Sequence, residues 1–301
     1  MLEESGDVIN VSPRVSPEPD GGFLIVDSRE ARIRIYRANG GLARQFGKRG
    51  QGPGELAAPR SGERTASNDI VIADVFSGVV MFDDTGGVMA SARPPVTPIY
   101  DVLPLTATTV LVSGPLWDST RRSVPYLVHR YNLATKKLEK SFFLEPGDSV
   151  VHAAAHTFGW VDLARRNDTV LAVFALVDSL YLFRPTGELL GALRLPIQGC
   201  QRIRAFEPRA IASPAAEAEW LAQHHFLEAV FPLADGSYIV QYERPAGTTS
   251  RWNLIGIWPD GRLRFDARDT PKLLAARNDS LFFVDPRSET PNRWLIARMR
   301  S

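Results

Sequence analysis

Residues Phe46–Leu56 read FGKRGQGPGEL and separate two near-copies of one sequence pattern. The copy before them, DGGFLIVDSREARIRIYRANGG, covers residues 20–41, and the copy after them, NDIVIADVFSGVVMFDDTGG, covers residues 68–87. Each copy reads as a turn, an apolar strand that ends in Asp, a polar loop, an alternating strand and a second turn. A repeat of this kind indicates the fold class before any single residue is considered.

The pattern continues to the end of the chain. First turns fall at Asp20-Gly21, Asn68-Asp69, Ala107-Thr108, Asn167-Asp168, Asp235-Gly236 and Asn278-Asp279, and second turns at Asn39-Gly40, Thr85-Gly86, Ala134-Thr135, Thr186-Gly187, Asp260-Gly261 and Thr290-Pro291-Asn292. The runs between them are short and rich in Val, Ile, Phe and Tyr, which is typical of strands joined by hairpins. Six units in 301 residues give a period of roughly 50 residues, as expected for four-stranded propeller blades.

We therefore predict an all-β fold, a six-bladed β-propeller with four-stranded antiparallel blades, as a single domain over residues 1–301. The chain ends in RWLIARMRS, which reads as the third strand of blade six. The stretch before Asp20 is long enough to supply the first inner strand, VINVSPRV at residues 8–15, and also a fourth strand for blade six. We expect residues before Val8 to pair with Trp294–Met299 and close the ring.

The stretch from about 195 to 230 departs from the repeat. Ser213 is a suitable N-cap, Pro214 suits the first helical position, and good helix formers follow. We predict one short helix, at about 214–224, within this inter-blade insertion. Connections of this length are often functional.

Composition limits the class of protein. Apolar residues make up 44% and charged residues 23%, as in soluble globular chains. The longest apolar run, residues 170–177, is too short to span a membrane, and the N-terminus lacks the regions of a signal peptide. We expect a monomer that is cytoplasmic, or exported if the chain is a mature or trimmed form. The single cysteine, Cys200, excludes an internal disulfide.

The first 90 residues resemble a known family. The Asp-Gly turn, the strand ending at Asp27, Arg32-Ile33, Asn39-Gly40 and the loop FGKRGQGPGEL followed by Pro59 resemble an NHL-type repeat. In style the chain is similar to bacterial six-bladed propeller proteins with GxGPGEF-type loops, a group that is mostly uncharacterised and often exported. That resemblance implies the fold. It leaves the function open, because the wider group includes binding scaffolds, single-stranded RNA binders and a few lyases.

The glycines of the loop, Gly47, Gly50, Gly52 and Gly54, suggest a phosphate cradle, but the Gly-Lys-Ser/Thr ending of a P-loop is missing. We interpret the loop as a tight crossover between blades. Carboxylates follow the first strands of several units, at Asp27, Asp74 and Asp285, and Asp178 is a candidate for the same position. We expect them to bond backbone amides of the next loop, with a calcium site as the alternative.

Histidines offer the main metal hypothesis. His152 and His156 lie four residues apart, which suits zinc if a third or fourth ligand is supplied, but HAAAH lacks the Glu of HExxH. His129 lies within the strand YLVHRY, and we expect it to point to the surface. No nucleophile motif such as GxSxG or SxxK occurs.

The sequence favours a non-catalytic module that binds a protein, peptide or small molecule without a cofactor. Net charge is +1 and no basic block occurs, which disfavours duplex nucleic acid. We expect recognition on the long-loop face at the channel mouth, by six residues: Arg49, Trp117, Arg121, His152, His156 and Arg204. The alternative is a metal-dependent lyase or hydrolase with His152, His156 and a third ligand on zinc or calcium. A third hypothesis is single-stranded RNA binding through the arginine loops.

Overall fold

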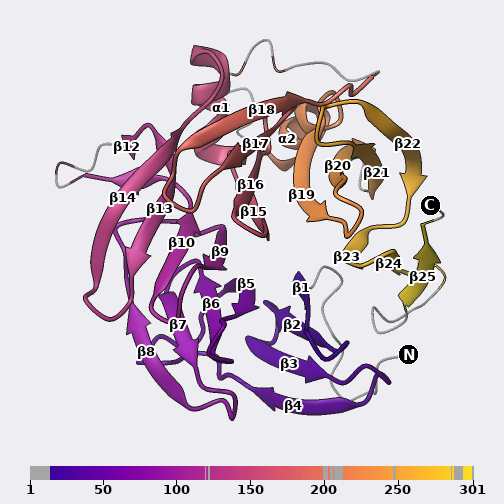
Figure 1. Cartoon of the computed structure of the whole chain (residues 1–301). Coiled ribbons are helices and arrows are strands. Elements are labelled where there is room, and N and C mark those ends of the chain that lie inside the picture. Colours follow the sequence, from indigo (N-terminus) through magenta and orange to yellow (C-terminus); the bar gives the residue numbers. More distant parts are fainter. Residues whose placement is uncertain are drawn as a thin grey trace. The chain divides into compact units, whose positions relative to one another are not determined.

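The fold is all-β and belongs to the class of six-bladed β-propellers with four-stranded antiparallel blades and little helix, which confirms the predicted fold class (Figure 1). The computed structural model describes residues 14–118, 120, 123–198, 203, 206, 213–246, 249–285, 287 and 294–299. The chain forms two compact units, one of residues 1–142 with 274–301 and the other of residues 143–273. Within the described ranges, no helix has the length and apolar character needed to cross a membrane.

The first unit holds blades 1, 2, 3 and 6. Blade 1 consists of β1 (Arg14–Pro17), β2 (Phe23–Asp27), β3 (Arg32–Tyr36) and β4 (Leu42–Phe46), and blade 2 of β5 (Pro59–Arg64), β6 (Ile70–Asp74), β7 (Gly78–Phe82) and β8 (Val88–Ala92). Blade 3 consists of β9 (Asp101–Pro104), β10 (Thr109–Ser113), β13 (Tyr126–Asn132) and β14 (Lys137–Leu144), with a ribbon of β11 (Leu116–Trp117) and β12 (Ser123–Val124) between β10 and β13. Blade 6 consists, in the described part, of β23 (Leu273–Arg277), β24 (Ser280–Val284) and β25 (Trp294–Arg298).

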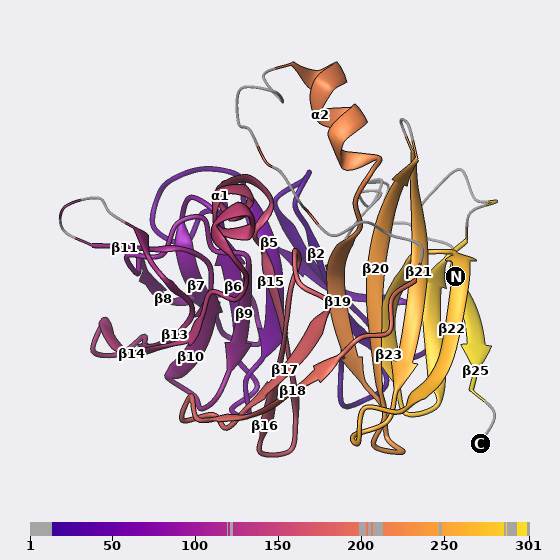
Figure 2. The same ribbon diagram turned by 90° about the horizontal axis from the view of Figure 1, so that it is seen from above.

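The second unit holds blades 4 and 5 and both helices. Blade 4 consists of β15 (Val161–Arg166), β16 (Thr169–Phe174), β17 (Ser179–Phe183) and β18 (Leu189–Arg194), and blade 5 of β19 (Phe226–Pro232), β20 (Tyr238–Ala246), β21 (Thr249–Ile257) and β22 (Leu263–Thr270). The predicted insertion helix is present as α2 (Pro214–Leu221). Figure 2 shows α2 on the side of this unit where β20 connects to β21.

The prediction of a single helix was wrong, because the crossover before blade 4 contains α1 (Ser149–Phe158). The Asp148 carboxylate accepts hydrogen bonds from the backbone amides of Val150 and Val151, and the Gly159 amide donates to Ala155 O. Two β-branched valines in the first turn weaken the helical signal. The N-cap Asp and the three alanines that follow those valines restore it.

Because the strands of each blade are antiparallel, its connections fall into two groups at opposite edges of the blade. Turns between the first two strands and between the last two lie at one edge, which we call the turn edge. Connections from the second to the third strand, and crossovers to the next blade, lie at the opposite edge, the loop edge. The predicted turns are confirmed within the described residues: for example, Gly40 N donates to Arg37 O and Gly86 N to Asp83 O, with φ values of 87° and 92° that favour glycine. The predicted turn at Thr290-Pro291-Asn292 lies outside them.

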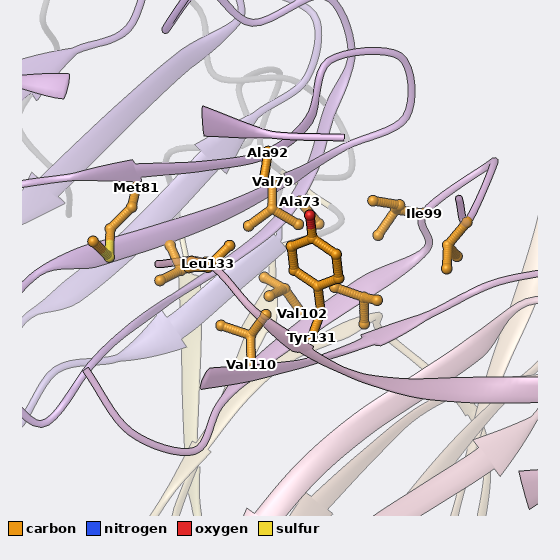
Figure 3. Close-up of a cluster of buried hydrophobic side chains, with 12 residues drawn as sticks. Ala73, Val79, Met81, Ala92, Ile99, Val102, Val110, Tyr131 and Leu133 are labelled. Carbon is orange, nitrogen blue, oxygen red and sulfur yellow. The ribbon is translucent and has the colours of Figure 1, made fainter. Parts of the chain in front are cut away.

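Blades pack through apolar clusters and through side chains of the inner strands. Between blades 2 and 3, a buried cluster includes Val79, Val102 and Tyr131 (Figure 3). Ser16 Oγ donates to Gly62 O over 2.9 Å, and Ser61 Oγ accepts from Val102 N over 3.1 Å. These bonds satisfy polar groups inside the fold and fix one inner strand against the next.

Blade 6 packs against blade 1 within the first unit. The Phe23 ring lies 4.8 Å from the Phe282 ring and 4.9 Å from that of Trp294, in edge-on contacts. The predicted pairing of residues before Val8 with β25 lies outside the described residues and stays a prediction. The first inner strand extends to Pro17, two residues beyond its predicted end, and its predicted start at residues 8–13 also lies outside them.

Candidate functional site

The glycine-rich segment is a crossover from β4 to β5, as predicted. The Leu56 amide donates to Lys48 O over 2.8 Å, and the Gly50 amide donates to Leu56 O over 3.0 Å, so the segment folds back on itself. The Glu55 carboxylate accepts from the Gly52 amide over 3.0 Å and pairs with Lys48 Nζ over 2.8 Å. These bonds, first of all the one from Lys48, hold the pKa of Glu55 below its usual value.

Glu55 explains why the loop is not a phosphate cradle in this fold. A β-carbon added at Gly50 would lie 1.8 Å from Glu55 Oε2, so the carboxylate occupies the hollow that the glycines create. A carboxylate of the chain itself therefore takes the place of the bound anion.

The aspartates that end the first strand of each repeat, which is the second strand of its blade, bond backbone amides, as predicted. Asp27 Oδ1 accepts from Arg29 N and Glu30 N, each over 3.0 Å. Asp74 Oδ1 accepts from Phe76 N and Ser77 N, and its Oδ2 accepts from Ala58 N over 2.8 Å. Asp74 thereby joins the end of the crossover to the second-to-third-strand loop of blade 2.

Asp285 and Asp178 differ from one another. Asp285 Oδ1 accepts from the Arg287 amide over 3.0 Å, which matches the predicted role. Asp178 instead lies 2.5 Å from His225 Nε2, where both side chains are largely buried. The expected alignment of Asp178 with the other aspartates is therefore wrong, since its principal partner comes from the insertion.

Arg49 ties the crossover to the neighbouring loop. Its guanidinium donates to Ala57 O over 3.2 Å and, on the other side, to the carbonyls of Ser28 and Arg29. Arg49 is exposed, but three carbonyl oxygens already engage it. It fixes the position of the loop at this edge.

A pocket of about 340 Å³ lies beside the crossover. Residues Gln51–Pro53 form one side of it, and Ser77, Ser91, Ala92 and Arg93 form the rest. Ser77 is 5% exposed, and its hydroxyl has no hydrogen-bond partner among the described residues. The Arg93 side chain is exposed and, within the same described part of the chain, forms no hydrogen bond or ion pair.

Gly78 is the reason that Ser77 and Arg93 are neighbours. Its φ is 93°, and a β-carbon there would lie 2.3 Å from Ala92 O and 3.0 Å from the Cα atom of Arg93. Only glycine permits this approach of the loop to the end of β8.

Trp117 belongs to the same part of the first unit. Its amide donates to Pro95 O over 3.1 Å and its indole N–H to Thr97 O over 2.7 Å, so β11 runs along the crossover that begins at Arg93. Trp117 remains 38% exposed, and Phe76, next to Ser77, is 67% exposed. The loop edge of this unit thus presents two exposed aromatic side chains in addition to the pocket that Arg93 lines.

The helices of the second unit carry the predicted histidines. His152 is exposed on α1, with Nε2 3.3 Å from Glu145 O. His156 is one turn further along α1, but its side chain lies outside the described residues. Arg121 and Arg204 also lie outside them, so the predicted grouping of six residues stays a prediction.

One insertion histidine, His224, is part of the packing between the helices. Phe158 of α1 stacks on Trp220 of α2 at 4.9 Å, and the His224 ring lies 4.3 Å from Trp220. Burial lowers the pKa of His224. Across the part of the chain that the structure describes, no group of three or more His, Cys, Asp or Glu side chains could hold a metal ion.

The expectation of a surface position for His129 was wrong. It is fully buried, with Nδ1 2.9 Å from Ser141 Oγ and Nε2 2.9 Å from Gly114 O. Burial lowers the pKa of His129 to about 4. Alternation along β13 fails as a guide because this strand lies between two others in its sheet and is buried on both faces, with Leu127, Val128 and His129 buried in succession.

A second pocket, of about 290 Å³, lies at the turn edge of the first unit between blades 6 and 1. Its lining includes Asn39, Gly40, Arg277, Trp294 and Ile296. It is the principal competitor of the loop-edge pocket for a ligand.

Comparisons with known proteins identify the fold. No protein-family model and no curated protein sequence matches this chain. A putative exported protein from Bacteroides fragilis is similar in structure, with a TM-score of 0.69 and 14% identity over 94% of this chain and 82% of that one. A member of the DUF4221 family from Bacteroides vulgatus has a TM-score of 0.66 and 10% identity, over 99% of this chain and 96% of that one.

A more distant likeness joins the chain to an enzyme. A catalytically inactive virginiamycin B lyase from Staphylococcus aureus, solved with quinupristin, has a TM-score of 0.55 and 10% identity over 94% of this chain and 78% of that one. At such identities the likeness shows the fold alone, because unrelated functions share the propeller architecture.

Proposed function

We propose that this chain is a non-catalytic binding module of the NHL type, which recognises a protein, peptide or small molecule at the loop edge of its blades. The observation that carries the proposal is the pocket of the first unit, which Arg93 lines beside a crossover that Arg49 bonds to the neighbouring loop. Two exposed aromatic side chains, Phe76 and Trp117, lie in connections of the same edge. Exposed aromatic and arginine side chains are the residues that contribute most to binding surfaces. The other members of the predicted set, Arg121, His152, His156 and Arg204, belong to the same type of connection in their own blades.

The turn edge offers less contact area. Its connections are short, such as Asn39-Gly40 and Asp83–Gly87, and their polar groups bond within the turn. Recognition is therefore assigned to the longer connections.

A ligand-stabilisation screen tests the proposal. Compounds and short peptides that raise the melting temperature are tested again on two variants, Trp117→Ala at the loop edge and Ile296→Ala at the turn edge. Both replace an exposed apolar side chain of the first unit. Stabilisation that is lost only in Trp117→Ala supports the proposal, and stabilisation lost only in Ile296→Ala overturns it.

The same samples test the catalytic alternative. After each stabilising compound is incubated with the protein, mass spectrometry should show that the mass of the compound is unchanged. Conversion of the compound, abolished by Ala at His152 or His156, would favour the lyase or hydrolase hypothesis.

A further inference from the structure

We infer that the loop-edge pocket of the first unit is a site for a carboxylate attached to an apolar group. The inference rests on the proposed function and adds the chemical class of the ligand. The polar side chains that line the pocket are those of Gln51, Ser77, Ser91 and Arg93, and no carboxylate is among them. Every one of these side chains can donate a hydrogen bond.

The charges around the pocket leave one positive charge available. Lys48 is paired with Glu55, and the Asp74 carboxylate is bonded to three backbone amides. Arg93 has no ion-pair partner among the residues that the structure describes. A single planar guanidinium matches a singly charged, planar carboxylate.

The buried hydroxyl supports the same conclusion. A buried polar group without a partner destabilises the folded chain, because it has given up its hydrogen bonds to water. The Ser77 hydroxyl has no partner among the described residues. A ligand oxygen that reaches it would remove this cost, and Asp74 already holds the Ser77 amide in place.

A dianionic phosphate fits this site less well. The Gly52 amide of the glycine-rich loop donates to Glu55 and the Gly50 amide to Leu56 O, so both are already engaged. The remaining side chains of the lining, those of Pro53 and Ala92, are apolar, and Phe76, next to Ser77 in the chain, is exposed. These contacts suit the aliphatic or aromatic part of the acid.

The site can be tested by NMR titration of the full chain labelled with ¹⁵N. The probes are N-acetylphenylalanine, its uncharged amide N-acetylphenylalaninamide, and inorganic phosphate. We expect the acid to shift the amide signals of Gly52, Ser77 and Arg93 saturably, and the amide and phosphate to bind at least about tenfold more weakly, because a charge-assisted bond contributes more than 1.4 kcal/mol.

Variants separate a binding role from a structural one. Arg93→Ala should weaken acid binding at least about tenfold, whereas Arg194→Ala, which removes another exposed arginine, at the end of β18, should leave it unchanged. Ser77→Ala should weaken binding while leaving the melting temperature equal or higher, because it removes a buried unsatisfied hydroxyl. A lower melting temperature for Ser77→Ala with unchanged binding would contradict the role of the hydroxyl.

The outcomes distinguish this inference from the proposed function. If acid and amide shift the loop-edge signals equally, the carboxylate site is wrong and the binding function stands. If no probe shifts these signals, the site is wrong, and the screen then decides the function separately. If phosphate binds more tightly than the acid, the ligand class is wrong.

Discussion

Two aspartates occupy the same position in consecutive repeats, and their surroundings differ. Asp27 and Asp74 both follow the second strand and bond the next loop. In blade 1 the Arg34 guanidinium, fully buried, pairs with Asp27 over 2.7 Å. In blade 2 the register places Val80 where blade 1 has Arg34. The first aspartate therefore compensates a buried charge, and the second satisfies only backbone amides.

The two positions should respond differently to the loss of charge. Asp27→Asn leaves Arg34 buried without a full counter-charge, and we expect it to lower the free energy of unfolding by about 3–5 kcal/mol. Asp74→Asn, the matched control, should cost about 1–2 kcal/mol. Urea unfolding of both variants measures the difference, and equal losses would contradict the role assigned to Arg34.

His129 gives the fold a pH dependence. Its pKa is about 4 in the folded chain, against an ordinary value of 6.5. Between these values the unfolded chain binds a proton that the folded chain does not, so stability is complete above pH 6.5 and falls as the pH drops toward 4. A shift of this size corresponds to about 3 kcal/mol.

Unfolding measured from pH 4 to 7 checks this expectation. His129→Gln should have a smaller slope of stability against pH than the unmodified chain. His224 contributes in the same direction because its pKa is also lowered, so the comparison between the two chains isolates His129. Identical slopes would show that His129 is not buried in its neutral form.

At the scale of elements, the glycine-rich crossover makes a tight turn around a carboxylate of its own, that of Glu55. The Gly52 amide and the Lys48 ammonium group both donate to the Glu55 carboxylate. The loop is therefore a phosphate-type hollow that the chain fills itself.

Glu55→Ala should empty that hollow. We expect phosphate, at several times its Kd, to stabilise this variant by about 1 kcal/mol, and to leave the unmodified chain unaffected. Melting temperatures at constant ionic strength measure the effect. Equal stabilisation of both proteins, or of neither, would contradict the part that Glu55 plays.

The elements show what the sequence could and could not predict. Turns such as Asn39-Gly40 were predictable because a positive φ selects for particular residues. Strand positions followed from short apolar runs between such turns. Helix α1 was not predicted because the two valines at its start have low helix propensity. Asp148, its N-cap residue, was a signal in the sequence that could have indicated the helix.

The pocket was beyond the reach of sequence for a different reason. Ser77 and Arg93 are brought together by packing of a loop against a strand end, and nothing in the local pattern of either residue reveals the other. Trp117 was predicted because an aromatic residue in a long loop is conspicuous, and its part in binding stays a prediction. The burial of Arg34 and His129 depends on tertiary packing, which overrides their usual preference for the surface.

At the scale of the whole chain, the last blade is joined to the first through Arg277. Its guanidinium donates to Gly21 O and lies 5.1 Å from the Phe23 ring centroid and 5.3 Å from that of Phe282. This residue of blade 6 thus holds the first turn and the first buried aromatic ring of blade 1.

Arg277→Ala should lower the free energy of unfolding by about 2–3 kcal/mol, from the loss of a charge-assisted hydrogen bond and two cation–π contacts. Arg298→Ala, the control, removes an exposed arginine from the lining of the same turn-edge pocket and should change stability by less than about 0.5 kcal/mol. Chemical unfolding of both variants provides the measurement. A loss no greater for Arg277 than for Arg298 would contradict its role in closing the fold.

The central claim is that the loop edge, and not the turn edge, is where this chain binds its ligand. The most direct measurement is a crystal structure of the chain with a compound selected by the stabilisation screen. We predict that the compound lies against Gly52, Arg93 and Trp117. A compound found in the pocket beside Asn39, Gly40 and Arg277 would contradict the account.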